Sequence, residues 1–437
     1  MFEHRYHMNM IPPVEERLNP FPFYSIMRHN NPVVYDEKID AWGVFRYYDV
    51  QSILGDYTNF SADPENSKPF QGEVIPATGK SLLKSDPPYH RTLRGVIASA
   101  FTPMAIDKIE PRIESIAHRL INQVIEKGNM DFINDLAYTL PVTVIAELLG
   151  VPMEDHSIFH KWFGRYFSQV VWLSEGVGIN EDEHALTKHL FQLRSEIDSY
   201  FNAIIDERTK SPQQDLISRL IKSKADGHAL SREEILSFCA LLFIAGHITT
   251  ANLMGNTILS LLQNPQQLKL LQSNRALLIP SSLEETLRYR SPIQAVIRNV
   301  VRDVNIGEQK IQSGSKVYVW LGSANHDESI FPEPEKFDIS RTPHGHAHVG
   351  FGHGIHFCLG APLARLESRV VLKILFNRLQ NVELDSDNIE NIKPIPSLIL
   401  HGVSHLPLRF KPGPQIDLKE EQTAIEKFLP NNSDLTP

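Results

Sequence analysis

The stretch FGHGIHFCLG, residues 351–360, contains Cys358, one of only two cysteines in this chain of 437 residues. It runs directly into APLARLE, residues 361–367, where a proline near the start predicts the first turn of a helix. Cys358 is therefore expected at the N-terminal end of a helix. Glycines on both sides let the backbone turn tightly, so that amide hydrogens and the helix dipole should lower the pKa of the thiol. The pattern predicts a protected thiolate that can act as a metal ligand.

Two other interpretations of this stretch are open. A cysteine before a helix is most often a small buried apolar side chain. The region is also rich in histidine, which would suit a zinc site formed from His344, His346, His348, His353 and His356. Such a site would have one nearby thiol and no second cysteine, which is an unusual ligand set for zinc.

The full context of Cys358 favours a haem ligand. Residues 351–360 resemble the haem-binding loop of cytochromes P-450 at each diagnostic position, namely Phe351, Gly352, Gly354, His356, Cys358 and Gly360. The resemblance implies that Cys358 is the axial ligand of haem iron, where a thiolate favours O–O cleavage. The chain has no Cys-x-x-Cys-His attachment site, so the cofactor would be a noncovalently bound b-type haem (heme b, iron protoporphyrin IX).

The composition excludes several classes of protein. With 42% hydrophobic and 22% charged residues, the chain has the make-up of a folded globular protein. Its formal net charge of -9 offers no positive field for a phosphate backbone, so no nucleic-acid partner is expected. No stretch approaches the ~20 apolar residues of a membrane span, and two cysteines exclude a disulfide framework. We expect a cytoplasmic protein without a membrane anchor.

Hydrophobic periodicity predicts a mainly α fold with small β-sheets. Helices are expected at residues 109–126, 190–208, 230–263, 281–289 and 363–379. Strands are expected at residues 33–35, 42–45, 296–301, 316–321 and 406–410. No repeat or linker divides residues 20–412, so we expect one large domain with a lead-in at 1–19 and a polar, acidic tail at 413–437. For residues 20–412 the resemblance implies the cytochrome P-450 fold.

Two further segments resemble the same family. Glu285 and Arg288 stand three residues apart on one face of a predicted helix, and the segment FPEPEKFDISR, residues 331–341, matches the one that supplies a second arginine. The resemblance implies that Glu285, Arg288 and Arg341 form a buried charge triad. We assign this triad to folding and to support of the haem loop, because a buried charge that loses its partner lowers the stability of the fold.

A group of basic residues is expected to bind the haem propionates. His90 and Arg94, in the segment DPPYHRTLR of residues 86–94, lie one helical turn apart and can both reach one anion. The resemblance adds His356, two residues before the cysteine, and Arg298, on a strand after the Glu-x-x-Arg helix.

The predicted helix at 230–263 carries the motif AGHITT at residues 245–250. It resembles the kinked oxygen-binding motif of the family, which implies a catalytic set of Ala245, Gly246, Ile248 and Thr249. Gly246 would remove bulk beside the haem, and Thr249 would hydrogen-bond dioxygen or water in the opened groove. An acid usually precedes the threonine in this family, whereas this chain has Ile248.

The implied activity is monooxygenation: one atom of dioxygen enters an apolar substrate of the steroid, terpenoid, fatty acid or polyketide class. Electrons would come from a ferredoxin or flavodoxin type donor with its NAD(P)H-dependent reductase. Arg91 and Arg365 match family positions that face an acidic donor. By family position, the pocket would be lined by residues 59–85, 241–249, 293–297 and 396–400, which are mainly apolar.

Two alternatives remain open at this point. One is a haem-thiolate nitric oxide reductase or dehydratase-like enzyme, which Ile248 in place of the acid keeps in play. The other is a haem sensor without enzymatic activity, which the threonine groove at Thr249 disfavours.

Overall fold

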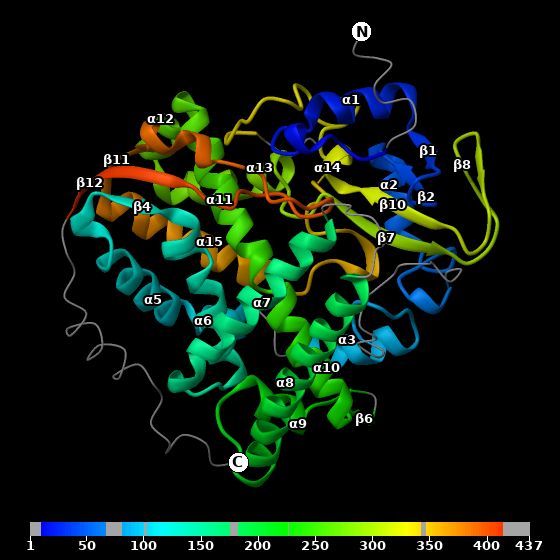
Figure 1. The fold of residues 1–437 in the computed structure, drawn as a ribbon, viewed down its shortest axis with the longest axis horizontal. Coiled ribbons are helices and arrows are strands. Elements are labelled where there is room, and N and C mark those ends of the chain that lie inside the picture. The colour runs from blue at the N-terminus through cyan, green and yellow to red at the C-terminus, as the bar shows by residue number, and fades with distance from the viewer. Residues whose placement is uncertain are drawn as a thin grey trace.

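The computed structural model describes residues 10–66, 81–99, 103–174, 182–225, 227–341 and 347–413. Helices dominate these residues and the two larger sheets lie at opposite sides of the molecule, which confirms the predicted mainly α fold with small sheets (Figure 1). The predicted polar tail lies outside the described residues except for Gly413.

The α-helices are α1 (Phe21–Asn30), α2 (Tyr47–Gly55), α3 (Tyr89–Ala98), α4 (Pro103–Asp107), α5 (Glu110–Asn122), α6 (Thr139–Leu149), α7 (His156–Ser174), α8 (Asp182–Lys210), α9 (Leu216–Lys222), α10 (Arg232–Ala245), α11 (Ile248–Gln263), α12 (Pro265–Ser273), α13 (Arg275–Tyr289), α14 (Leu321–Ala324) and α15 (Ala361–Arg378). The strands are β1 (Val33–Asp36), β2 (Ala41–Val44), β3 (Phe60–Ser61), β4 (Asn129–Asp131), β5 (Lys224–Ala225), β6 (His228–Ala229), β7 (Ala295–Val300), β8 (Val304–Ile306), β9 (Gln309–Ile311), β10 (Lys316–Trp320), β11 (Leu379–Leu384) and β12 (Pro407–Pro412).

The largest sheet has the strand order β1-β2-β10-β7-β3. Its strand β10 runs parallel to β2 and antiparallel to β7, so that Val317 lies opposite both Trp42 and Arg298. A second sheet has the order β11-β12-β4, and β5-β6 and β8-β9 form two small pairs. The pairing of β7 inside the large sheet fixes the backbone that carries Arg298.

The predicted strands all fall on observed strands, within two residues at each end. The predicted helices are also present, but four of them differ in their bounds. The helix predicted at 109–126 ends at Asn122, and the helix predicted at 190–208 begins earlier, at Asp182. The helix predicted at 281–289 begins earlier, at Arg275, because Pro280 lies inside α13 instead of ending it. The helix predicted at 230–263 is divided into α10 and α11 by the break at Gly246 and His247.

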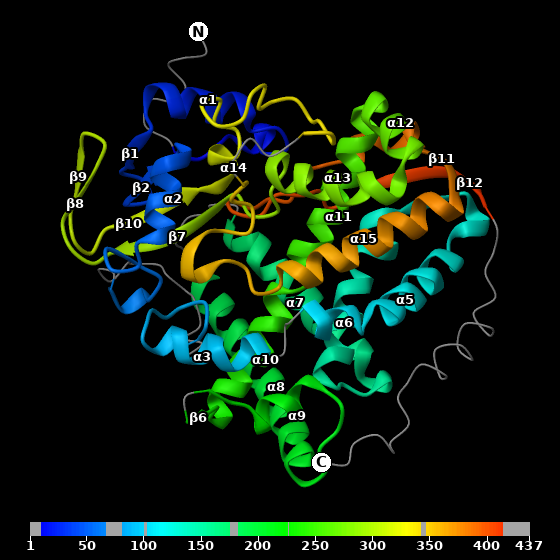
Figure 2. The same ribbon diagram turned by 180° about the vertical axis from the view of Figure 1, so that it is seen from behind.

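The main core surrounds α11, which crosses the centre of the helical part of the molecule (Figures 1 and 2). Buried side chains from several helices pack together there, including Leu253 of α11, Leu283 of α13 and Val371 of α15. A smaller cluster joins the large sheet to α2 through residues such as Val317 and Ile53. The segment after the cysteine therefore begins a helix, α15, that is anchored in the main core.

The expectation that no stretch approaches the apolar length of a membrane span is wrong for the segment Arg232–Gln263, which is long and apolar enough and is the one such candidate among the described residues. However, 61% of its most apolar window is buried inside the protein, as is usual for a core helix. Its first turn has a capping box, because the Ser231 hydroxyl accepts a hydrogen bond from the Glu234 amide and the Glu234 carboxylate accepts one from the Ser231 amide.

Candidate active site

The cysteine loop folds back on itself before α15 begins. The amide of Cys358 donates a hydrogen bond of 2.9 Å to the carbonyl of Phe351, which closes the loop. Gly352 and Gly354 have φ values of +76° and +71°, the left-handed region that favours glycine. A Cβ at Gly354 would also lie 2.6 Å from the carbonyl oxygen of Leu54 in α2. These two glycines therefore allow the loop to turn and to pack against α2.

The prediction that the helix terminus lowers the pKa of Cys358 is wrong in its net sign. Burial of the thiol is the largest effect and raises its pKa. The amides of Gly360 and Ala361 and the charges of Arg94 and Arg365 act in the opposite direction, as expected at a helix terminus, but they do not outweigh burial. The protein thus places hydrogen-bond donors and cations near the sulfur that partly offset the effect of burial on its pKa. A bound metal cation would be needed to make the thiolate the stable form.

Three of the residues predicted to bind an anion meet beside Asp86. The ring centroids of His90 and His356 lie 4.4 Å apart. Nε2 of His356 is 3.8 Å from Asp86 Oδ1, too long for a hydrogen bond. Arg298 is 9% exposed, and burial lowers its pKa while the charge of Asp86 opposes that shift. The structure therefore gathers His90, His356 and Arg298 in one buried place.

Two atoms of this cluster indicate an absent polar group. Nε2 of His90 and Nε2 of His356 are both buried, and neither has a hydrogen-bond partner among the described residues. Burial, followed by the charges of His356 and Arg94, lowers the pKa of His90 to about 4, so its ring is neutral near pH 7. Buried ring nitrogens without partners are costly. The carboxylates of a haem would supply acceptors for them, so the residues present fit that cofactor.

Arg94 bridges α3 to the cysteine loop. Its Nη2 donates a 2.7 Å hydrogen bond to the carbonyl of Phe357, the residue before Cys358. Its charge also acts on both His90 and Cys358. Arg94 therefore contacts the cysteine loop and carries its charge close to both His90 and the sulfur.

The predicted kink in the long helix lies at Gly246 and His247, between α10 and α11. A Cβ at Gly246 would meet Ile145 Cδ1 at 2.7 Å and the carbonyl oxygen of Leu242 at 2.9 Å. The missing side chain of Gly246 thus makes room for Ile145 of α6. Ala245, by contrast, is exposed at the end of α10.

The residues after the kink differ in their surroundings. Thr249 is partly exposed and its hydroxyl donates a 2.8 Å hydrogen bond to the carbonyl of Ala245. Ile248 is 6% exposed and packs in the main core. His247 is 1% exposed, its Nε2 lies 2.7 Å from the carbonyl oxygen of Tyr138, and burial lowers its pKa to about 3. His247 therefore points into the protein as a neutral ring.

The predicted charge triad is confirmed. Arg288 makes two hydrogen bonds to Glu285, at 2.8 and 2.9 Å, and Arg341 Nε lies 3.2 Å from Glu285 Oε2. Arg288 Nη1 also donates to the carbonyls of Asn325 and Pro334, at 3.0 and 2.8 Å. The triad fastens the segment around residue 335 to α13, and thereby supports the chain that leads into the cysteine loop.

The histidines considered for a zinc site are separated. His344 and His346 lie outside the described residues. His348 contacts Glu284, His353 is exposed, and His356 faces His90. Within the described part of the chain, no three His, Cys, Asp or Glu side chains form a group that could hold a metal ion.

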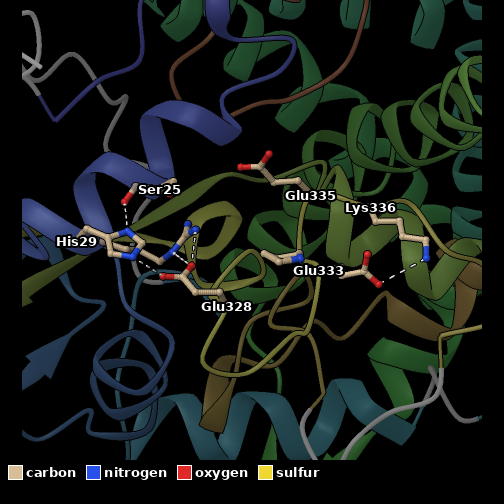
Figure 3. A pocket seen from close by; sticks show the side chains of 8 residues that line it. Ser25, His29, Glu328, Glu333, Glu335 and Lys336 are labelled. Carbon is tan, nitrogen blue, oxygen red and sulfur yellow. Dashed lines mark hydrogen bonds and ion pairs between the residues drawn. The ribbon is translucent and has the colours of Figure 1, made fainter. Parts of the chain in front are cut away.

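A hollow on another face of the molecule does not have the character of an active site. It lies between α1 and the segment around residue 333, and Figure 3 shows its polar lining, which consists of Ser25, Arg28, His29, Glu328, Glu333, Pro334, Glu335 and Lys336. Its charges pair with one another, as in Arg28–Glu328 at 2.9 Å and Lys336–Glu333 at 3.5 Å. An apolar substrate would gain little binding free energy from this polar lining.

Two residues near the cysteine were missed by sequence reasoning. Asp86 accepts hydrogen bonds from the Ser61 hydroxyl and from the Ala62 amide, and it lies beside the anion cluster. Glu284 binds Arg365 with two hydrogen bonds, at 2.6 and 2.8 Å. The available signals were the position of Asp86 at the start of the His90 motif and the adjacency of Glu284 to Glu285.

Residues 32–409 match the family model described as Cytochrome P450. The chain belongs to the cytochrome P450 family. Among curated relatives, it is 39% identical to the putative cytochrome P450 YjiB of Bacillus subtilis (strain 168), over 89% of this chain and 93% of that protein. It is 36% identical to the erythromycin C-12 hydroxylase of Saccharopolyspora erythraea, over 91% of this chain and 96% of the relative.

A solved P450 structure has the same fold. The crystal structure of CYP109E1 from Bacillus megaterium in complex with testosterone superposes with a TM-score of 0.79 at 38% identity, covering 90% of this chain and 99% of that one. Together with the hydroxylases and epoxidases among its relatives, this match identifies the protein as a P450 monooxygenase.

Proposed function

We propose that this P450 binds heme b noncovalently, with Cys358 as the iron ligand and with His90, Arg94, Arg298 and His356 holding the propionates. The observation that carries this assignment is that Nε2 of His90 and Nε2 of His356 are buried without a hydrogen-bond partner among the described residues, Asp86 Oδ1 being 3.8 Å from His356 Nε2. When bound, the haem supplies the oxygen chemistry, in which one atom of dioxygen enters a C–H or C=C bond at the expense of two electrons and two protons.

The residues on the opposite side of the site would control water and protons. We assign the oxygen groove to Ala245, Gly246, Ile248 and Thr249, at the break between α10 and α11. The Thr249 hydroxyl can hold a water molecule, and the hydrocarbon of Ile248 excludes water on its side of the helix. The carboxylate that usually precedes the threonine is absent, so protons must reach Thr249 by another route.

The substrate is proposed to be a steroid, terpenoid, fatty acid or polyketide. Solved relatives bind such compounds: CYP109E1 was crystallised with testosterone and with corticosterone, and a mutant of EryK with erythromycin B. The electron donor is proposed to be a ferredoxin or flavodoxin with its NAD(P)H-dependent reductase, in the cytoplasm. Arg91 is exposed on α3 and is available to an acidic donor.

The ligand assignment can be tested with the two cysteines. The reduced carbonyl complex of the purified protein should have the red-shifted Soret band of thiolate ligation. Cys358→Ser should abolish this band, while Cys239→Ser should keep it, because Cys239 is fully buried and burial raises its pKa. Loss of the band in the Cys239 variant alone would contradict the assignment.

The activity can be tested by reconstitution with ferredoxin, reductase and NADPH over a library of lipophilic compounds. Oxygenated product supports the proposal. Formation of nitrous oxide from nitric oxide, without any oxygenated product, would instead support a reductase on the same fold.

A further inference from the structure

The guanidinium of Arg365 lies between the cysteine loop and α13. It makes a two-pronged contact with Glu284, with Nε 2.6 Å from Oε1 and Nη2 2.8 Å from Oε2. Its Cζ lies over the ring of Phe351, 4.6 Å from the ring centroid. This is a cation–π contact with the residue that opens the cysteine loop. Arg365 is therefore held on one side by a carboxylate and on the other by the loop itself.

His348 makes a second contact between Glu284 and the loop. Its Nε2 lies 3.1 Å from Glu284 Oε2, and its Nδ1 accepts a 3.2 Å hydrogen bond from the Gly350 amide. Since Nδ1 accepts, the ring proton belongs on Nε2, from where it is donated to Glu284. The His348 ring centroid also lies 6.3 Å from that of Phe351. Glu284 is thus the common partner of both side chains that flank Phe351.

Phe351 in turn contacts the backbone of the cysteine. Its carbonyl accepts the Cys358 amide at 2.9 Å, so the position of Phe351 helps to set the position of the sulfur. The backbone at Glu284 is held in place, because the ion pairs of Arg288 and Arg341 fix its neighbour Glu285 in the charge triad.

The charges of this group are also coupled to the sulfur. Burial alone would raise the pKa of Glu284, but hydrogen bonds from Arg365 and His348 outweigh it and lower that pKa to about 2, so the carboxylate is ionised at neutral pH. The charge of Arg365 favours the Cys358 thiolate. An ionised Glu284 offsets much of the positive charge that Arg365 presents to Cys358.

We propose that Glu284 is a positioning residue of the haem-thiolate loop, which holds Arg365 over Phe351 and offsets the guanidinium charge near Cys358. This role rests on the proposed function of Cys358 as the iron ligand. It also changes the expectation for Arg365, since a guanidinium already engaged by Glu284 is a poor docking cation for an electron donor. Arg91, on the exposed side of α3, remains available for that purpose.

The test compares Glu284→Gln with a matched control at a second ion pair made by the same helix, α15. Arg369, one turn further along α15, pairs at 3.0 Å with Glu110 of α5, and the two arginine side chains are similarly exposed, at 38% and 37%. Glu110→Gln therefore removes an equivalent ion pair that does not contact Phe351. Both variants are prepared as full-length holoprotein, and the measurements are the reduction potential of the iron and the rate at which the reduced carbonyl complex loses its thiolate band.

Glu284→Gln should shift the reduction potential to more positive values, because the Arg365 charge is no longer offset and favours the reduced iron. It should also accelerate loss of the thiolate band about threefold, as expected for one partly exposed ion pair. Glu110→Gln should do neither. The double variant Glu284→Gln/Arg365→Gln should restore the reduction potential toward the wild-type value, because both charges are removed. It should not restore the persistence of the thiolate band, because the ion pair that holds residue 365 over Phe351 is still missing.

Arg365→Lys keeps the charge but loses the planar two-pronged contact, so it should accelerate loss of the band with little change in potential. It also gives a second test if Glu284→Gln yields no holoprotein. Equal potentials and equal decay rates for Glu284→Gln, Arg365→Lys and Glu110→Gln would overturn the proposal. A wild-type protein without a thiolate band would instead contradict the assignment of Cys358.

Discussion

The hydroxyl of Thr249 donates its hydrogen bond to the carbonyl of Ala245, at 2.8 Å, across the break between α10 and α11. Carbonyls at the end of a helix lack the amide partner of a continuous helix, and the Thr249 hydroxyl meets that need. In this arrangement Thr249 offers lone pairs to the groove, and it must release Ala245 before it can donate there. In the proposed function, the break in the helix and the oxygen chemistry thus share one hydroxyl group.

Replacement of Thr249 should separate these two roles. Thr249→Val keeps the shape of the side chain but removes the hydroxyl, so we expect less product and more peroxide per NADPH, with haem content near the wild-type value. Thr249→Ser keeps the hydroxyl and should stay close to wild type. Product and peroxide are measured per NADPH with a confirmed substrate. A Thr249→Val variant that couples NADPH to product as well as Thr249→Ser would show that the hydroxyl serves only the helix.

Ile248 should tolerate an acid poorly, although an acid is usual at this position in the family. Its side chain is 6% exposed and lies in the main core, so Ile248→Glu would bury a carboxyl group without an evident partner. We expect a loss of roughly 1–3 kcal/mol in the free energy of unfolding. Ile248→Val, as control, should lose less than about 1.5 kcal/mol. A stable Ile248→Glu variant that forms more product per NADPH would show that the acid reaches the groove and that Ile248 weakens proton delivery.

The two left-handed glycines of the cysteine loop should differ in their tolerance of alanine. Gly352 has φ +76° and its nearest neighbour to an added Cβ would be His356 O at 3.8 Å, so Gly352→Ala carries only the backbone strain of about 1–2 kcal/mol. Gly354→Ala adds a contact of 2.6 Å with the backbone oxygen of Leu54, which cannot rotate away. We expect Gly354→Ala to lose clearly more unfolding free energy and haem content than Gly352→Ala. If chemical denaturation gives the same loss of unfolding free energy for the two holoproteins, α2 must shift to accommodate the added Cβ at residue 354.

Patterns local to the chain predicted much of this site. Three of these patterns involve residues close together in the chain: the spacing of His90 and Arg94, the turn glycines, and the sequence around Cys358. Each could therefore be recognised in the sequence without knowledge of the fold. The break at Gly246 was also predicted, since a family motif marks it. What the sequence could not provide was the partner of each side chain across the fold, such as Ile145 for Gly246.

The same limit explains one error in electrostatics. The expected drop in the pKa of Cys358 considered the helix terminus but not burial, which depends on packing far away in sequence and is the larger effect. The sequence also contained no sign that Arg365 pairs with Glu284, which lies 81 positions earlier in the chain. Charges that pair across two helices leave no periodic signal.

Buried histidines should make the protein sensitive to mild acid, and His401 allows the clearest test. Its Nε2 lies 3.1 Å from the carbonyl oxygen of Leu18, and burial, with a smaller contribution from the charge of Arg290, lowers its pKa to about 4. In the unfolded chain the value is near 6.5. Between these two values the unfolded state binds more protons than the folded state, so the stability contributed by neutral His401 is present above pH 6.5 and is lost as the pH falls toward 4.

The integrated effect for this residue is at most about 3 kcal/mol. His401→Gln can keep the hydrogen bond to Leu18 but cannot take up a proton, so its free energy of unfolding should fall less steeply between pH 6.5 and 4 than that of the wild type. His189→Gln, at an exposed side chain of α8, is the control and should change the slope less than His401→Gln does. Chemical denaturation of the holoproteins at several pH values gives the slopes directly. If His401→Gln and the wild type lose stability in parallel, the acid sensitivity must come from other buried groups, of which His247 is the first to examine because burial lowers its pKa to about 3.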